Sequence, residues 1–191
     1  MSDKPTLQHF IITRFNIRAN YGCKLRNPEN DPMKRILEEG YLEQRFNIFE
    51  KFTLQSIKQQ TNQNFTWLIL FHKQTPKKFL ERIKQLKKEF DFIDLYFEDD
   101  ERFSFSDYYN SNEYYITTRI DNDDMIENDY IARVQQYANQ NLHECVLSFD
   151  KGIKYDINLN KKYAYERKDN HFLSMIGKKE IAFYNIIMLK F

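Results

Sequence analysis

Cysteine is scarce in this sequence, which contains only Cys23 and Cys145 among 191 residues. The two thiols have neither the close spacing of a zinc motif nor the number that a disulfide framework needs. Scarce cysteine is typical of proteins from a reducing compartment. The composition therefore excludes the small disulfide-stapled secreted class and favours a cytoplasmic location.

Glycine and proline are also scarce, with four residues of each. The sequence has no Gly-x-x-x-x-Gly-Lys or Gly-x-Gly-x-x-Gly string, so a glycine-rich loop that cradles phosphates is excluded. The Gly-x-Ser-x-Gly string of serine hydrolases is missing as well. No low-complexity tether divides the chain, and its length suits one domain, so we expect residues 1–191 to form a single domain.

The sequence lacks long apolar runs and an excess of one charge. No stretch reaches the roughly 18 apolar residues that cross a bilayer, and residues 1–5 contain no apolar core of a secretory signal. The 29 basic and 28 acidic residues are interspersed and give a formal net charge of +1. That balance argues against a polyanionic partner such as nucleic acid. Hydrophobic residues make up 41% of the chain, enough for a sizeable core.

What the sequence does contain is a series of short apolar runs that alternate with stretches of helical periodicity. The runs predict buried strands at residues 10–15, 65–71, 92–97, 114–120 and 145–149. The periodicity predicts helices near residues 42–57, 76–90 and 128–140. Strands that are separated by helices pair in parallel through right-handed crossovers. The expected fold is therefore α/β, with a mostly parallel central sheet flanked by helices.

Several other segments have local signatures. Residues 21–32 hold glycine, proline and asparagine and are expected to form a long loop. Thr75-Pro76 is expected to begin a helix, with the threonine as its N-cap and the proline as its first residue. Residues 153–157 and 162–165 are candidates for a hairpin, and the apolar run at 181–189 fits either type of element.

An acidic string, Asp121-Asn122-Asp123-Asp124, follows the fourth predicted strand. Ligands of parallel sheets bind beyond the carboxyl ends of the strands. If the strand continues, Arg119, Asp121 and Asp123 share a face, because alternate residues of a strand do so. Converging carboxylates repel each other, and a Mg²⁺ or Mn²⁺ ion that also binds a diphosphate relieves that repulsion. The alternative is a solvated turn that binds no ligand.

Arg14 and Asn16 leave the first predicted strand at its carboxyl end, the edge that also holds the acidic string. These side chains are candidates for contacts with a base, a ribose or a phosphate, and an arginine suits phosphate geometry. An ordinary strand end at the surface explains the same residues equally well. The two interpretations stay open at the level of sequence.

Four segments carry a resemblance to a known family. They are 9–16 (HFIITRFN), 49–57 (FEKFTLQSI), 65–71 (FTWLILF) and 117–124 (TTRIDNDD), and the last is the most specific. In this order they resemble the rhamnosyltransferase-like family of bacterial glycosyltransferases, which has the A-type (GT-A) nucleotide-sugar-binding fold. Chains of that family usually continue further, which predicts a GT-A-type domain that is incomplete at the C-terminus.

The resemblance implies transfer of a sugar from a nucleotide-diphosphate donor to a glycan acceptor in surface polysaccharide biosynthesis. Asp121 and Asp123 match the metal-binding Asp-x-Asp motif of the family, with Asp124 beside them. The implied cofactor is Mn²⁺ or Mg²⁺. A lipid-linked acceptor, with peripheral attachment at the inner face of the membrane, is an open alternative to a free cytoplasmic protein.

The resemblance also implies a nucleotide-sugar pocket. Thr13, Arg14 and Asn16 would line it at the first strand. Arg119 would support the diphosphate beside Asp121. The sugar, the nucleotide, the linkage and the oligomeric state are not specified by these residues.

Two alternative functions and the identity of the catalytic base stay open. The chain is either an active transferase or an inactive or truncated GT-A-like module that binds a nucleotide or a partner. A metal-dependent phosphohydrolase is a third possibility, although such enzymes usually gather more carboxylates or histidines around two metals. Inversion at the sugar requires a carboxylate that deprotonates the acceptor, and Asp150 and Asp169 are candidates for it.

Overall fold

The computed structural model describes residues 7–17, 32–98, 108, 114–168 and 172–179. Most of the loop expected at 21–32 and the whole apolar run at 181–189 lie outside these residues. The helices are α1 (Pro32–Leu37), α2 (Glu39–Ile48), the π-helical segment η2 (Phe49–Thr53), α3 (Leu54–Lys58), α4 (Lys77–Glu89) and α5 (Tyr130–Gln140). The strands are β1 (Leu7–Arg14), β2 (Thr66–His72), β3 (Ile93–Glu98), β4 (Tyr114–Arg119), β5 (Cys145–Ser148), β6 (Lys151–Asp156), β7 (Lys161–Glu166) and β8 (Leu173–Gly177).

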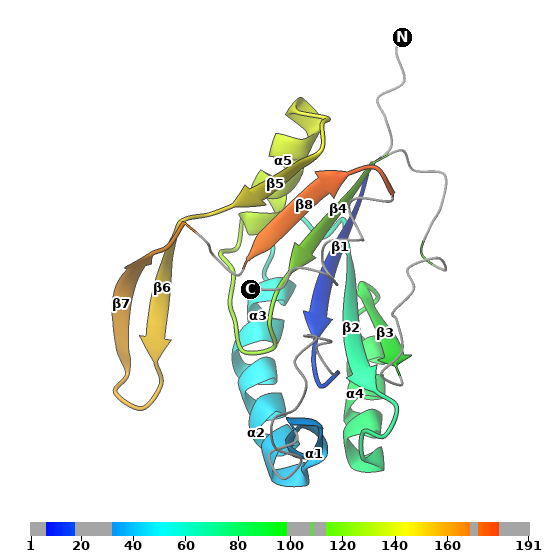
Figure 1. Cartoon of the computed structure of the whole chain (residues 1–191). Coiled ribbons are helices and arrows are strands. Elements are labelled where there is room, and N and C mark those ends of the chain that lie inside the picture. The colour runs from blue at the N-terminus through cyan, green and yellow to red at the C-terminus, as the bar shows by residue number, and fades with distance from the viewer. Residues whose placement is uncertain (1–6, 18–31, 99–107, 109–113, 169–171, 180–191) are drawn as a thin grey trace.

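A six-stranded sheet in the order β3-β2-β1-β4-β8-β5 forms the centre of the molecule (Figure 1). β1 pairs in parallel with β2 and β4, and β2 pairs in parallel with β3. β8 is antiparallel to both of its neighbours, β4 and β5. The predicted α/β class with a mostly parallel central sheet is therefore confirmed. The expectation did not include β8, a five-residue strand inserted between β4 and β5.

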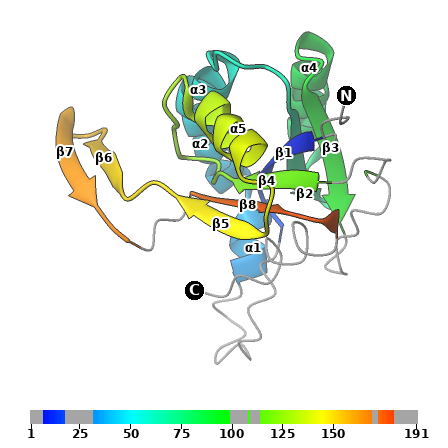
Figure 2. The same cartoon turned by 90° about the horizontal axis from the view of Figure 1, so that it is seen from above.

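The two faces of the sheet bury different sets of side chains, as the alternation of a strand requires. Ile11 of β1 and Trp67 of β2 belong to the large core cluster, which includes residues from α2 to α5. Phe10 and Leu68 belong to a smaller cluster on the opposite face. Seen from above, α2, α3, α4 and α5 all lie on one side of the sheet (Figure 2).

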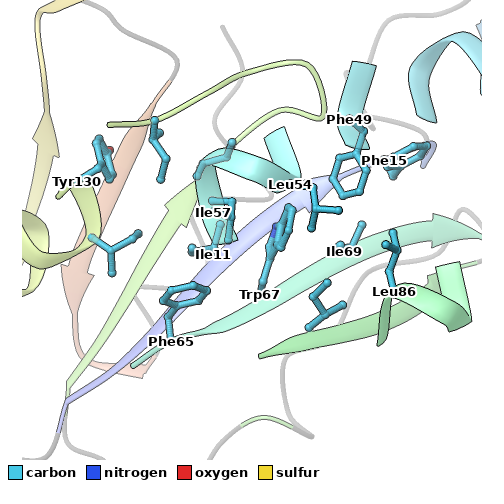
Figure 3. Packing of buried hydrophobic residues seen from close by; sticks show 14 of the residues in the cluster. Ile11, Phe15, Phe49, Leu54, Ile57, Phe65, Trp67, Ile69, Leu86 and Tyr130 are labelled. Carbon is cyan, nitrogen blue, oxygen red and sulfur yellow. The ribbon is translucent and has the colours of Figure 1, made fainter. Parts of the chain in front are cut away.

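The predicted helix at 42–57 is a continuous helical run made of α2, η2 and α3. Leu42, Phe46, Phe49 and Ile57 are all at most 1% exposed, so the predicted apolar stripe is confirmed. Figure 3 shows Leu54 and Ile57 of α3 beside Trp67 and Ile11 of the sheet. This packing holds the helical run against β1 and β2.

The expected start of α4 is corrected by one position. Pro76 occupies the N-cap position, and the first helical residue is Lys77. The Thr75 hydroxyl does not cap the helix but donates to the carbonyl oxygen of His72 at 2.5 Å. Thr75 also accepts a hydrogen bond from Asn16 Nδ2 at 3.0 Å. The hydroxyl therefore braces the turn between β2 and α4 against the end of β1.

The candidate hairpin is present as β6 and β7, which pair antiparallel and form a separate two-stranded sheet. It extends away from the central sheet (Figure 1). Its residues are mostly exposed.

Candidate functional site

The strands β1, β2 and β4 run in parallel and end at the same edge of the sheet (Figure 1). Their last residues are Arg14, His72 and Arg119. The residues predicted for the site lie at the ends of β1 and β4 or within a few residues of them. The topology therefore brings the first strand and the acidic string to one edge, as expected from the crossover rule.

Arg119 and Asp121 form an ion pair at the end of β4. The Arg119 Nε and Nη2 atoms both lie 3.2 Å from Asp121 Oδ1, and Nη2 lies 3.2 Å from Oδ2. The Arg119 side chain is 16% exposed, and that of Asp121 is 36% exposed. The arginine thus holds a partly exposed carboxylate in place at the carboxyl edge.

The next two residues of the string contact α2. Asn122 is 2% exposed, and its Nδ2 donates to the Phe15 carbonyl oxygen at 2.9 Å. Its Oδ1 accepts a hydrogen bond from Arg45 Nη2. Arg45 Nη1 also lies 3.0 Å from Asp123 Oδ2. Asn122 therefore fixes the string to the end of β1, and Arg45 orients Asp123.

This geometry departs from the expected shared face of Arg119, Asp121 and Asp123. β4 ends at Arg119, so the alternation of a strand does not continue into the string. A turn follows instead, in which the Asp124 amide donates to the Asp121 carbonyl oxygen at 3.2 Å. As a result, Asp121 and Asp123 contact two different arginines.

Arg45 was not identified from the sequence. It lies on α2, a helix that was predicted from its apolar stripe alone. The guanidinium carbon lies 5.9 Å from the centre of the Tyr41 ring, one turn earlier. The Tyr41–Arg45 spacing is the only signal for it, and such i, i+4 pairs are common on helices.

Asp124 is the most perturbed carboxyl of the string. Its pKa is raised to about 7, first by burial and then by the negative charges of Asp123 and Asp121. Crowded carboxylate oxygens are the ligands that hard divalent cations prefer, so the donor chemistry of the string fits Mn²⁺ or Mg²⁺. Within the described part of the chain, however, no three His, Cys, Asp or Glu side chains are gathered as a ready metal site.

The predicted nucleotide-pocket residues on β1 have different environments. Thr13 is fully buried, and its Oγ1 accepts a hydrogen bond from Trp67 Nε1 at 2.9 Å. Asn16 is 2% exposed, and its Oδ1 accepts from the His72 amide at 3.2 Å. These two side chains stabilise the edge in the structure, and their contact with a nucleotide stays a prediction.

Arg14 is partly exposed and lies on the sheet face opposite to α2, α3, α4 and α5 (Figure 2). The register pairs Ile12 with Arg119, and Ile12 belongs to the smaller cluster on that face. Arg14, two residues beyond Ile12, shares the face. Arg14 and Arg119 are therefore on the same face near the ends of neighbouring parallel strands.

Of the two candidates for the catalytic base, Asp150 is exposed and follows β5, and its carbonyl oxygen accepts from the Arg167 amide at 2.8 Å. Asp169 lies outside the described residues. Among the interactions of the described residues, no contact places the Asp150 carboxylate at the carboxyl edge of β1, β2 and β4.

Comparisons with known proteins give one family. A family model described as "Putative rhamnosyl transferase" matches residues 8–178. No curated protein matches the sequence.

Among solved structures, that of residues 1–349 of TarS from S. aureus is similar, at 10% identity and a TM-score of 0.43. The match covers 84% of this chain and 47% of the TarS chain, so this chain spans about half the length of that structure. A likeness of this size has no bearing on function. Among the described residues, no helix is both long and apolar enough to cross a bilayer.

Proposed function

Because the chain belongs to the family of putative rhamnosyl transferases, a family of glycosyltransferases, we propose that it transfers a sugar from a nucleotide-diphosphate donor to a glycan acceptor. The proposal includes a role in surface polysaccharide biosynthesis and a cytoplasmic location, with a lipid-linked acceptor as one form of the substrate. The observation that carries it is the acidic string at the carboxyl edge of β1 and β4, where Arg119 pairs with Asp121 and Arg14 lies on the same sheet face as Arg119.

The two arginines suit the diphosphate of the donor. Arg14 and Arg119 lie on one face near the ends of neighbouring strands, and a guanidinium matches phosphate geometry. Arg119 already holds Asp121, so a diphosphate bound there lies next to the acidic string. Asn16, through its bonds to the His72 amide and Thr75, keeps the β1 and β2 ends in register behind that position.

Asp121, Asp123 and Asp124 would hold Mn²⁺ or Mg²⁺. The ion would supply positive charge that stabilises the departing diphosphate. Burial is the first cause of the raised pKa of Asp124, and the negative charges of Asp123 and Asp121 add to it. A cation bound by the string would offset the part that comes from these two charges. Asp123 is bonded to Arg45 in the structure, so it would exchange the arginine for the cation.

The test is an assay of nucleoside-diphosphate release from UDP-, dTDP- and GDP-sugars, in the presence of a bacterial glycan acceptor fraction. We expect release from one donor class that requires the acceptor and Mn²⁺ and stops when the metal is chelated. Inorganic phosphate released without an acceptor would instead indicate a phosphohydrolase. Nucleotide binding without release from any donor would indicate an inactive nucleotide-binding module.

A further inference from the structure

The β6–β7 hairpin has a surface that sugar transfer does not explain. It exposes Ile153, Ile157 and Leu159, which are 66%, 49% and 60% exposed, together with Tyr155 and Tyr163. A surface that contacts only water rarely exposes so many large apolar side chains on one two-stranded sheet.

The hairpin is also strongly basic. Residues 151–168 include six basic and two acidic side chains, a formal net charge of +4, whereas the whole chain carries +1. The rest of the chain therefore carries −3. The α4 segment at 77–89 has the same count of six basic and two acidic residues. The two segments differ in how these charges are partnered.

On α4 most of the basic side chains are neutralised by neighbours. Arg82 pairs with Glu50 and Glu43, and Lys78 pairs with Glu39. Lys84 pairs with Glu81, and Lys87 pairs with Asp94. By contrast, the hairpin lysines form no ion pair with any residue that the structure describes. These are Lys151, Lys154, Lys161 and Lys162.

The tip of the hairpin is an ordered turn that presents its two aliphatic side chains. Asp156 Oδ1 accepts hydrogen bonds from the amides of Asn158 and Leu159, at 3.0 and 2.9 Å. Tyr155 Oη donates to Asn160 Oδ1 at 2.7 Å across the turn. At the body of the protein, the Tyr155 ring lies 6.1 Å from the Phe52 ring of η2, centroid to centroid. These contacts fix the turn that carries Ile157 and Leu159.

We propose that the β6–β7 hairpin docks the protein on an anionic lipid surface. The unpaired lysines are complementary to anionic headgroups, and Ile157 and Leu159 enter the interfacial layer. A second copy of the chain is a poorer occupant, because two hairpins of charge +4 repel each other. An anionic polymer in water matches the lysines but leaves the aliphatic tip exposed.

The direction of the hairpin suits this role. Its turn points to the same side of the molecule as the carboxyl ends of β1, β2 and β4 (Figure 1). A membrane that meets the tip therefore lies on the side of the candidate site. The docking itself does not depend on the proposed transfer reaction, and its test uses neither a nucleotide sugar nor an acceptor.

The experiment is co-sedimentation of the full chain with vesicles of phosphatidylcholine alone, or with about one third phosphatidylglycerol. We expect binding to the anionic vesicles only, with loss of binding as salt rises to about 0.5 M. The variant Lys154→Gln/Lys161→Gln/Lys162→Gln is expected to bind roughly a hundredfold more weakly, at about fivefold for each charge. The tip variant Ile157→Ser/Leu159→Ser is expected to bind about tenfold more weakly at unchanged net charge.

The matched control is Lys77→Gln/Lys84→Gln/Lys88→Gln, which removes the same charge from the exposed side of α4 and is expected to change binding less than about threefold. All three variants change exposed side chains, and circular dichroism verifies their fold. The proposal is overturned if the wild type does not bind anionic vesicles, or if the α4 control weakens binding as much as the hairpin variant. Full binding by the tip variant would overturn it too, as would self-association that the tip variant abolishes.

Discussion

Replacing Asp121 by alanine is expected to lower the rate of sugar transfer by at least about a hundredfold, because stabilisation of a departing diphosphate is worth several kcal/mol. The carboxylate is partly exposed at the end of β4, where it is held by Arg119, so its loss removes charge from the site and leaves the core intact. Steady-state kinetics with the donor identified in the release assay provide the measurement. We expect the loss in kcat/KM.

The matched control for this substitution is Asp129→Ala. Asp129 is likewise an aspartate in an ion pair, with Arg133 Nη2 at 2.9 Å, but it is more exposed than Asp121 and precedes α5 rather than following β4. Its replacement is expected to change transfer less than about threefold, since exposed ion pairs contribute about 0–1 kcal/mol. If Asp121→Ala retains activity within threefold of the wild type, the acidic string does not act in the reaction.

Acidification is expected to destabilise the protein through His9. His9 is completely buried, and burial lowers its pKa from 6.5 to about 3. A folded-state pKa below the unfolded value gives full stability above pH 6.5, which is lost as pH falls toward the folded pKa. Between about pH 7.5 and about pH 5, the protonation of His9 alone is expected to lower the free energy of unfolding by about 2 kcal/mol.

The contacts of His9 explain why the neutral form is required. Gln135 Nε2 donates both to Asn64 O, at 2.8 Å, and to His9 Nδ1, at 3.3 Å. His9 Nε2 then donates to Thr118 Oγ1 at 2.8 Å, and Thr118 lies 2.6 Å from Ser174 Oγ. Protonation at Nδ1 would break the bond from Gln135 and place a charge among helix α5 and three strands.

Urea unfolding of the wild type and His9→Gln at the two pH values isolates this contribution. Asp124 acts in the opposite direction, because its raised pKa means that its contribution to stability is lost as pH rises toward 7. It is present in both proteins, so the difference between them reports His9. The wild type should lose about 2 kcal/mol more than His9→Gln on acidification. Equal losses would contradict the assignment.

The elements predicted most accurately from sequence are those with a local signal. β1 and β2 are short apolar runs, and Trp67, Ile11 and their neighbours are buried on both faces as that pattern requires. The apolar stripe from Leu42 to Ile57 likewise predicted the helical run of α2, η2 and α3, and its residues are buried. Local pattern did not predict β8, because its position between β4 and β5 is decided by pairing with residues distant in sequence.

The same limit applies to the candidate site. The edge that holds Arg14 and Arg119 followed from the order of strands and helices, and the structure places both arginines on one face. The sequence did not predict the ion-pair partner of Asp123, because Arg45 lies on a helix and is 78 residues away from Asp123 in the sequence. Thr75 was assigned to a helix cap, whereas its hydroxyl is taken by His72 and Asn16, which are brought together only by the sheet.

The most direct test of the proposed function is binding of nucleoside diphosphates by the purified chain, because it needs neither the sugar nor the acceptor. Thermal unfolding is followed with UDP, dTDP and GDP, each with and without Mn²⁺. We expect one nucleotide to stabilise the protein only when Mn²⁺ is present, by about 2.7 kcal/mol at a hundredfold excess over Kd. We also expect Asp121→Ala to remove this stabilisation and Asp129→Ala to keep it. A cooperatively folded wild type that no nucleotide stabilises, with or without Mn²⁺, would contradict the proposed nucleotide site.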